Sequence, residues 1–130
     1  MRLKRSELKE LYYRKRTVTK DAEGGTEETF GQPEAFKGIL WPAGGKVQAA
    51  MYGEKLPYMF NIKVDGKYGY WRVDGRLQYV LENGIAIMEL DGISLSAESE
   101  DTGQPDYQIV AIRPYEHLQL EVEQIDRRNG

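Results

Sequence analysis

The chain has 130 residues, 40% of them hydrophobic and 11% aromatic, with 18 Lys and Arg, 21 Asp and Glu, one His and no Cys. The lack of Cys excludes disulfide scaffolds, thiolate metal sites and thiol catalysis, and a single His excludes sites that need two imidazoles. The length is typical of one domain with its own core, so we expect residues 1–130 to form a single domain. No apolar run approaches the length of a membrane span, and the first residues lack the apolar stretch of a secretory signal. We therefore expect a domain made in the cytoplasm, without a membrane partner.

The formal net charge of −3 hides an uneven distribution. Residues 1–20 contain eight Lys and Arg and two Glu, a net charge of +6, whereas residues 21–130 contain ten and 19, a net charge of −9. A basic segment on an acidic body favours contact with nucleic acid or with the acidic face of another copy. Association between copies is the simpler interpretation, because this sequence supplies both charges. A solvated basic edge without a partner is the alternative.

Residues 1–11 form a basic N-terminal segment, in which Ser6 predicts a short capped turn with Leu8, Leu11 and Tyr12 on one face.

Further along, strands are predicted at Tyr12–Thr19 and Ala35–Trp41. The acidic stretch Asp21–Thr29 between them is predicted to be a mobile loop.

One short helix is predicted at Gly45–Tyr52, where Val47, Ala50 and Met51 fall at helical spacing and Gly53 can cap the C-terminus. Two turns of helix are too short to be stable alone, so tertiary or quaternary contacts must hold this segment.

The middle of the chain is divided by turn signals at regular intervals. Asp-Gly and Asn-Gly pairs tolerate the positive φ angles of tight hairpins, and their recurrence every eight or nine residues is typical of an antiparallel sandwich or barrel. The pairs are Asp65-Gly66, Asp74-Gly75, Asn83-Gly84 and Asp91-Gly92.

The segments between and after these turns have strand patterns. Apolar and polar residues alternate along Tyr58–Val64 and along His117–Ile125, which predicts two half-buried strands. Ile109–Ile112 and Ile85–Leu90 are apolar on both faces and are predicted to be central strands, with a bend at Pro114. The polar stretch Ser96–Pro105 predicts a second mobile loop, and residues 126–130 a tail. The fold class expected is all-β, a small antiparallel barrel or sandwich of about six strands with one short helix.

Motifs that would indicate catalysis or cofactor binding are absent. Gly44-Gly45-Lys46 fails the phosphate-loop pattern, because Leu40 stands where a Gly is required and Val47 where Ser or Thr is required. There is no Gly-x-Ser-x-Gly elbow and no EF-hand spacing. His117, beside Glu116, is a conceivable general base, but an isolated strand His is more often a surface residue. We expect no catalytic residue, no cofactor and no metal ion.

Rings and cations alternate in one segment. On a small barrel such residues could stack single-stranded bases while the cations follow the backbone, but cross-strand packing or a subunit interface explains them more simply. The candidate nucleic-acid face consists of Lys67, Tyr68, Tyr70, Trp71 and Arg72.

Three segments in order resemble the head closure, or head–tail joining (head–tail adaptor), proteins of tailed phages. They are Ile39–Leu56, with its Trp-Pro-small and Tyr-Gly-Glu elements, the Asp91-Gly92-Ile93 turn, and Pro105–Ile112, which is followed by a charged last strand. The resemblance extends from about Tyr12 to Ile125 and departs from the family pattern at Lys67–Arg76, which could be an inserted hairpin.

The resemblance implies a six-stranded barrel or sandwich without catalytic residues. Its copies would form a ring between the portal or adaptor and the tail-completion proteins, around a channel through which DNA passes without sequence-specific binding. The chain would then be made in the host cytoplasm and end in the virion neck. An acidic channel would let DNA slide, so we expect Glu98, Glu100 and Asp101, or the Trp41–Leu56 connection, to face it.

A ring of identical subunits joins unlike faces, so the basic N-terminal side would meet an acidic flank of the next copy. The residues expected in the subunit interface are Arg2, Lys4, Arg5, Arg14, Lys15, Arg16, Val47, Met51 and Tyr52.

Overall fold

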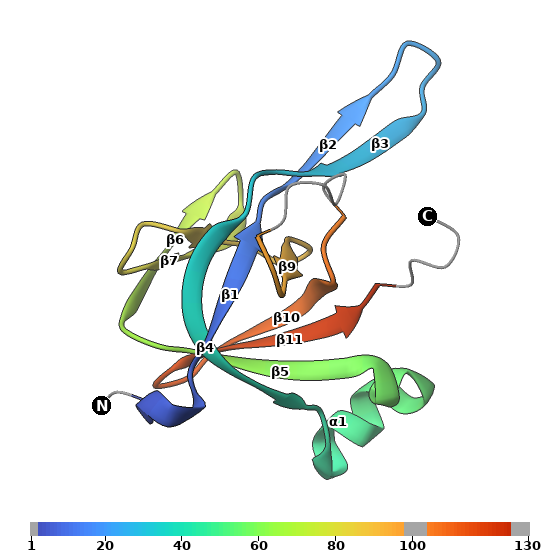
Figure 1. The fold of residues 1–130 in the computed structure, drawn as a ribbon. Coiled ribbons are helices and arrows are strands. Elements are labelled where there is room, and N and C mark those ends of the chain that lie inside the picture. Colours follow the sequence, from blue (N-terminus) through green and yellow to red (C-terminus); the bar gives the residue numbers. More distant parts are fainter. Residues whose placement is uncertain (1–2, 98–103, 126–130) are drawn as a thin grey trace.

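The computed structural model describes residues 3–97 and 104–125, and this part of the chain is mostly β-structure (Figure 1). Its body is a closed antiparallel barrel of six strands, with one short α-helix on the outside, which confirms the predicted fold class. The barrel strands, in spatial order, are β1 (Lys9–Arg14), β4 (Glu34–Pro42), β5 (Met59–Val64), β11 (Leu118–Gln124), β10 (Tyr107–Pro114) and β9 (Gly92–Ser94).

The short strand β9 closes the barrel. Its central residue, Ile93, lies opposite Tyr13 of β1 on one side and opposite Tyr107 of β10 on the other. Gly92 allows this closure, because a Cβ atom there would lie 2.6 Å from Cγ of Pro105. The apparent Asp91-Gly92 hairpin signal therefore marks a close approach of two chain segments. Asp74-Gly75 and Asn83-Gly84 do join paired strands, whereas Asp65-Gly66 connects strands of two different sheets.

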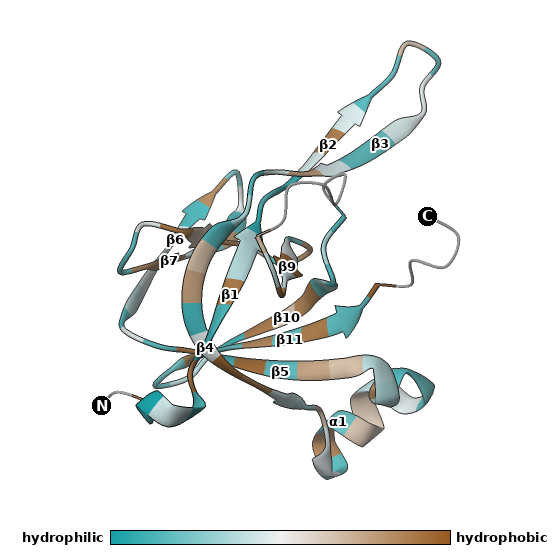
Figure 2. Ribbon diagram, viewed as in Figure 1, coloured by the Kyte–Doolittle hydropathy of each residue, from teal (hydrophilic) through white to brown (hydrophobic). Residues whose placement is uncertain are grey.

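Alternation of side chains along the strands builds the core. Leu40, Ile62 and Leu120 lie opposite one another on β4, β5 and β11 and point inward. Figure 2 shows that the hydrophobic positions gather in the barrel strands. The buried core consists of Leu11, Tyr13, Phe36, Ile62, Val64, Tyr79, Leu81, Ile85, Ile87, Ile93, Tyr107, Ile109, Ile112, Leu118, Leu120 and Val122.

Strands β10 and β11 match the two C-terminal predictions with small differences. The register shifts between Ile109 and Ala111, which leaves one extra residue on β10 as a bulge. Pro114 ends β10 opposite Leu118, at the predicted bend. His117 was predicted to begin the last strand but lies in the turn before it, because β11 begins at Leu118.

A two-stranded arm continues the β1–β4 pair beyond the barrel (Figure 1). It consists of β2 (Arg16–Lys20) and β3 (Thr26–Phe30). The predicted single strand Tyr12–Thr19 is therefore two strands, divided at Lys15. The prediction that Asp21–Thr29 is a loop was wrong for its second half, which belongs to β3 and pairs with β2. Thr26 and Thr29 favour a strand there, because Thr has high strand propensity.

The segment between β5 and β9 forms a separate sheet of three strands beside the barrel. Its strands are β6 (Tyr68–Val73), β7 (Arg76–Leu81) and β8 (Ala86–Ile87). Strands β6 and β7 are joined by Asp74 and Gly75, both with positive φ, as the Asp-Gly signal predicts. The longer strand predicted at Ile85–Leu90 was wrong: only two of its residues pair with β7, and Leu90 has φ 77°.

The helix α1 spans Gly45–Tyr52, as predicted, and Gly53 ends it with φ 52°. A 3₁₀ turn, η2 (Gly53–Tyr58), leads from it into β5. The predicted N-terminal turn is present as the 3₁₀ turn η1 (Arg5–Glu7), but Ser6 lies inside it and gives no side-chain cap. Leu11 and Tyr12, predicted on one face of that turn, belong to strand β1, where Leu11 reaches the core.

Candidate subunit interface

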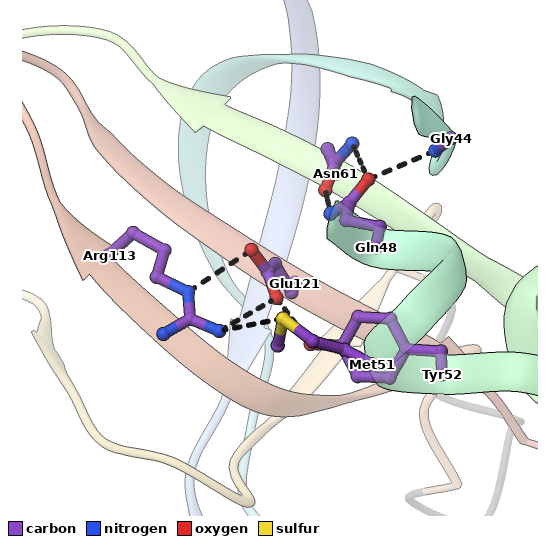
Figure 3. A network of polar contacts seen from close by, with 7 residues as sticks. All are labelled: Gly44, Gln48, Met51, Tyr52, Asn61, Arg113 and Glu121. Atoms are coloured by element: carbon purple, nitrogen blue, oxygen red, sulfur yellow. Dashed lines mark hydrogen bonds and ion pairs between the residues drawn. The ribbon is translucent and has the colours of Figure 1, made fainter. Parts of the chain in front are cut away.

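Helix α1 is attached to the outer wall of the barrel through polar side chains (Figure 3). Gln48 exchanges two hydrogen bonds with Asn61 of β5: its Nε2 donates to Oδ1 at 2.6 Å, and its Oε1 accepts from Nδ2 at 3.2 Å. The same Oε1 accepts a bond from the backbone N–H of Gly44 at 2.9 Å. Asn61 is buried under the helix, so the start of α1 is fixed to β5 through an amide pair whose bonds are shielded from water.

The other end of the helix is held by Glu121, which lies on the outer face of β11 and is nevertheless buried. Its carboxylate accepts a bond from the Tyr52 hydroxyl and two from Arg113, Nε to Oε2 at 3.2 Å and Nη2 to Oε1 at 3.3 Å. Arg113 Nη2 also lies 3.9 Å from the sulfur of Met51. This bidentate ion pair is a charge-assisted contact of fixed geometry.

The titration behaviour of these groups follows from their contacts. Burial by itself raises the pKa of Glu121, but the bonds from Arg113 and Tyr52 stabilise the carboxylate more and bring the pKa below its ordinary value of 4.5. Burial and the bond to Glu121 raise the pKa of Tyr52 to about 12. At neutral pH the carboxylate is therefore charged and the phenol is protonated, the states that this arrangement requires.

The apolar side chains of α1 are not buried against the barrel. Val47 is 73% exposed and Met51 48% exposed, and no residue of the helix is buried. A surface helix usually buries its apolar stripe, whereas α1 contacts the barrel through Gln48, Tyr52 and the sulfur of Met51 and leaves Val47 in water. Of the three interface candidates on this helix, Val47 and Met51 are open to a partner, whereas the Tyr52 hydroxyl is already bonded to Glu121.

The basic interface candidates differ in how available they are. Lys4, Arg5 and Lys15 are exposed. Arg14 is buried and its Nε donates to the carbonyl of Gly31 at 2.9 Å, so its side chain holds the base of the arm. Arg16 forms an ion pair with Glu28 across the arm. Arg2 lies outside the described residues, as do the channel candidates Glu98, Glu100 and Asp101.

A buried polar centre at the base of the arm was not predicted from the sequence. The carboxylate of Asp91 accepts a bond from the Tyr13 hydroxyl, one from the backbone N–H of Arg16 at 2.9 Å and one from that of Met88 at 3.0 Å. Burial, and then this contact, raise the pKa of Tyr13. Because Asp91 precedes a glycine, the sequence suggested an exposed turn there. The only sign that Asp91 differs from the other turn residues was the spacing of the pairs: Asp91-Gly92 follows Asn83-Gly84 after eight residues, whereas the earlier pairs are nine apart.

Glu121 and Arg113 were also missed, because alternation along a strand assigns both to the solvent side. The spacing of Gln48 and Tyr52 offered one sign: residues four apart share a helix face, and this pair is the face that contacts the barrel.

An open groove of about 480 Å³ lies near the N-terminal turn. His117 contributes to it, and its Nδ1 is buried without a hydrogen-bond partner in the described part of the chain. No ion pair joins His117 to a carboxylate among the described residues. Lys63 Nζ lies 5.7 Å from the ring centre of Trp41, as a cation–π contact. The lining residues are Leu3, Lys4, Glu7, Ile39, Trp41, Lys63, Glu116 and His117.

The residues of the candidate nucleic-acid face do not share one face of their sheet. Tyr70 lies opposite Tyr79, so Tyr68, Tyr70 and Arg72 share the face of Tyr79, although Tyr70 and Arg72 are themselves exposed. Trp71 lies on the other side and donates its indole N–H to Gln78 at 2.7 Å. The Tyr68 hydroxyl donates to the carbonyl of Tyr115. Lys67 precedes the strand and is exposed.

Within the described ranges, no group of three or more His, Asp or Glu side chains is arranged to hold a metal ion. None of the described helices has the length and apolar character needed to cross a membrane. Comparisons of the chain with protein-family models, with curated proteins and with solved structures find no match.

Proposed function

We propose that this chain is a non-enzymatic structural subunit of the neck of a tailed phage or prophage particle. Copies of it form a ring between the portal or adaptor and the tail-completion proteins, around the channel through which DNA leaves. The chain is made in the host cytoplasm and ends in the assembled particle. The resemblance of Ile39–Leu56, Asp91–Ile93 and Pro105–Ile112 to head closure proteins is the starting point.

The observation that supports this most is the exposure of apolar side chains on α1. The helix is fixed to the barrel by Gln48, Tyr52 and their partners, so it does not need its apolar side chains for attachment. Val47 is left facing water, and Met51 is 48% exposed although its sulfur contacts Arg113. Exposed apolar side chains on a rigid support are typical of surfaces that another protein covers.

The distribution of charge supports self-association. Exposed Lys4 and Arg5 lie at the N-terminal turn, while the body that follows is acidic overall. Unlike charged faces on one subunit favour head-to-tail contacts, and such contacts form rings when the rotation closes.

The test is to find the chain in particles. The gene is fitted with a short affinity tag in the source organism, tailed particles are purified after induction, and gold-labelled antibody to the tag is imaged by electron microscopy. We expect label at the junction of head and tail. Particles that form normally without any tagged chain would overturn the proposal.

A matched pair of variants then tests the role of the helix. Val47→Asp places a charge on the exposed side of α1 and should reduce incorporation into particles, while Lys46→Asp, also exposed and one position earlier, controls for charge. If both variants are incorporated equally well, α1 is not the covered surface.

A further inference from the structure

The arm formed by β2 and β3 has no third strand among the residues that the structure describes. Almost all of its residues are exposed, and Figure 2 shows it as mostly hydrophilic or neutral. A hairpin of two strands is marginally stable in water, and stable sheets have a third strand or a covered face. In the described part of the chain, β2 pairs only with β3, so both outer edges of the arm are open.

The hydrogen-bonding pattern shows which backbone groups are available on the arm. The N–H of Gly31 donates to Lys15 at 2.8 Å and the N–H of Asp21 donates to Gly25 at 2.9 Å. Because bonded and non-bonded pairs alternate in an antiparallel ladder, Thr17 and Thr29 form a bonded pair. The N–H and C=O groups of Glu28 therefore point away from β2, toward the free edge of β3.

A second open edge of similar length lies on β6. The N–H of Leu81 points toward β8, where it donates to Ile85 at 2.8 Å, so its partner Tyr68 turns its own backbone groups away from β7. By alternation Tyr70 and Arg72 do the same. In residues 3–97 and 104–125, none of these outward groups on β6 has a backbone hydrogen bond.

The two edges are complementary. Strand β3 contains two carboxylates and no cation, whereas β6 contains Arg72 and no carboxylate, with exposed Lys67 just before it. Neither Arg72 nor Lys67 forms an ion pair within the described residues. Exposed rings and aliphatic side chains lie along β6, with Tyr70 69% and Trp71 55% exposed, and Phe30 ends β3.

We propose that β3 of one copy adds to the free edge of β6 of the next copy, so that a second copy of this chain is the partner of the arm. One antiparallel register places Glu28 opposite Arg72 and Phe30 opposite Tyr70. It extends the three-stranded sheet to five strands. Because the arm and β6 are different surfaces, the contact is head-to-tail and repeats from copy to copy. This inference names the contact between neighbouring copies in the proposed ring, and it rests on that proposed function.

The absence of native Cys allows a direct test by disulfide formation. In the proposed register Thr29 lies opposite Trp71 in a non-bonded pair, where side chains are close enough for a disulfide. Equimolar Thr29→Cys and Trp71→Cys proteins are mixed under mild oxidation, and we expect a disulfide-linked heterodimer. Thr17→Cys is the matched control: it lies opposite Thr29 on the far strand of the arm, too far from β6 to react.

A second pair of variants tests the edge without Cys. Glu28→Pro removes an outward N–H of β3 without breaking the β2–β3 ladder, and Val18→Pro does the same on β2. We expect Glu28→Pro to weaken self-association at least tenfold in sedimentation equilibrium, and Val18→Pro to leave it unchanged. Glu28→Ala keeps the backbone N–H but loses the carboxylate and its ion pair with Arg16. It therefore distinguishes the effect of the backbone hydrogen bond from the effect of the charge.

Several outcomes would overturn the proposal. These are cross-linking of Thr17→Cys equal to that of Thr29→Cys, association unaffected by Glu28→Pro, or a chain that neither cross-links nor associates at millimolar concentration. The last result would mean that a different protein covers the arm. The tests are independent of the particle experiment: a cross-link in a chain absent from particles would remove the neck assignment alone, and neck labelling without a cross-link would remove the docking alone.

Discussion

Tyr52 and Glu121 lie 69 positions apart in the chain, and the hydroxyl of the first donates a hydrogen bond to the carboxylate of the second. This contact joins the last turn of α1 to the outer wall of β11. Since the helix buries no apolar side chain, such polar contacts are what determine its position.

Replacing Tyr52 by Phe should therefore loosen α1 while leaving the barrel intact. Loss of one hydrogen bond to a charged group should lower the free energy of unfolding by about 1.5–3 kcal/mol. Amide hydrogen exchange should accelerate along Gly45–Tyr52 and remain unchanged in β5 and β11. Tyr58→Phe is the control, because Tyr58 is exposed and its hydroxyl has no hydrogen bond among the described residues. Equal exchange in both variants would contradict this role for Tyr52.

The stabilising effect of Glu121 should depend on pH in a defined direction. Its pKa in the folded chain lies below the ordinary value of 4.5, mainly because bonds from Arg113 and Tyr52 outweigh the effect of burial. The carboxylate therefore contributes stability above about pH 4.5 that is lost as the pH falls through the folded value. The difference in urea midpoint between the wild type and Glu121→Gln should be largest near neutral pH and shrink in acid. A difference that is constant or grows in acid would contradict the assignment.

Much of the architecture could be predicted because it depends on local patterns. Alternation along Tyr58–Val64 and His117–Ile125 located two barrel strands, and the Asp74-Gly75 pair located a hairpin. Burial on the outer face could not be predicted in the same way. Asn61 and Glu121 occupy polar positions of alternating strands, and only the placement of α1 over them makes them buried. Strand β3 of the arm was missed for a related reason, since it has no apolar face to produce a pattern.

Asp91 should be among the most sensitive polar residues of the barrel. In Asp91→Asn an amide NH₂ replaces one of two oxygens that accept bonds from Tyr13, Arg16 and Met88, so a donor faces a donor in a buried site. We expect a loss of roughly 2–4 kcal/mol in the free energy of unfolding, measured by urea denaturation. Asp74→Asn is the control, because Asp74 is an exposed turn residue whose positive φ Asn tolerates. Similar losses in both variants would show that Asp91 is not the centre of this network.

Substitution of Gly92 and of Gly69 by Ala should distinguish the effect of close packing from that of strand propensity. A Cβ atom on Gly92 would lie 2.6 Å from Pro105 Cγ and 3.0 Å from Phe30, whereas one on Gly69 would meet nothing within 4 Å. We expect Gly92→Ala to lower the free energy of unfolding by about 1–3 kcal/mol through overpacking where β9 closes the barrel. Gly69→Ala should be neutral or slightly stabilising. A neutral Gly92→Ala would mean that Pro105 yields without cost.

Binding of single-stranded DNA is the functional alternative that the chain allows to be tested most simply. A strand-binding surface needs several rings and cations on one face, and the register separates Trp71 from Tyr70 and leaves Arg72 as the one cation of β6 beside it. We therefore expect no change in the fluorescence anisotropy of a labelled oligonucleotide of about 12 nucleotides at low salt, up to roughly 100 µM protein. If binding occurs, falls steeply with added salt and is lost in Tyr70→Ala but not in Trp71→Ala, the face of the β6–β8 sheet that carries Tyr70 binds nucleic acid. Tyr70 would then be a contact to bases, and DNA would compete with β3 of another copy for β6.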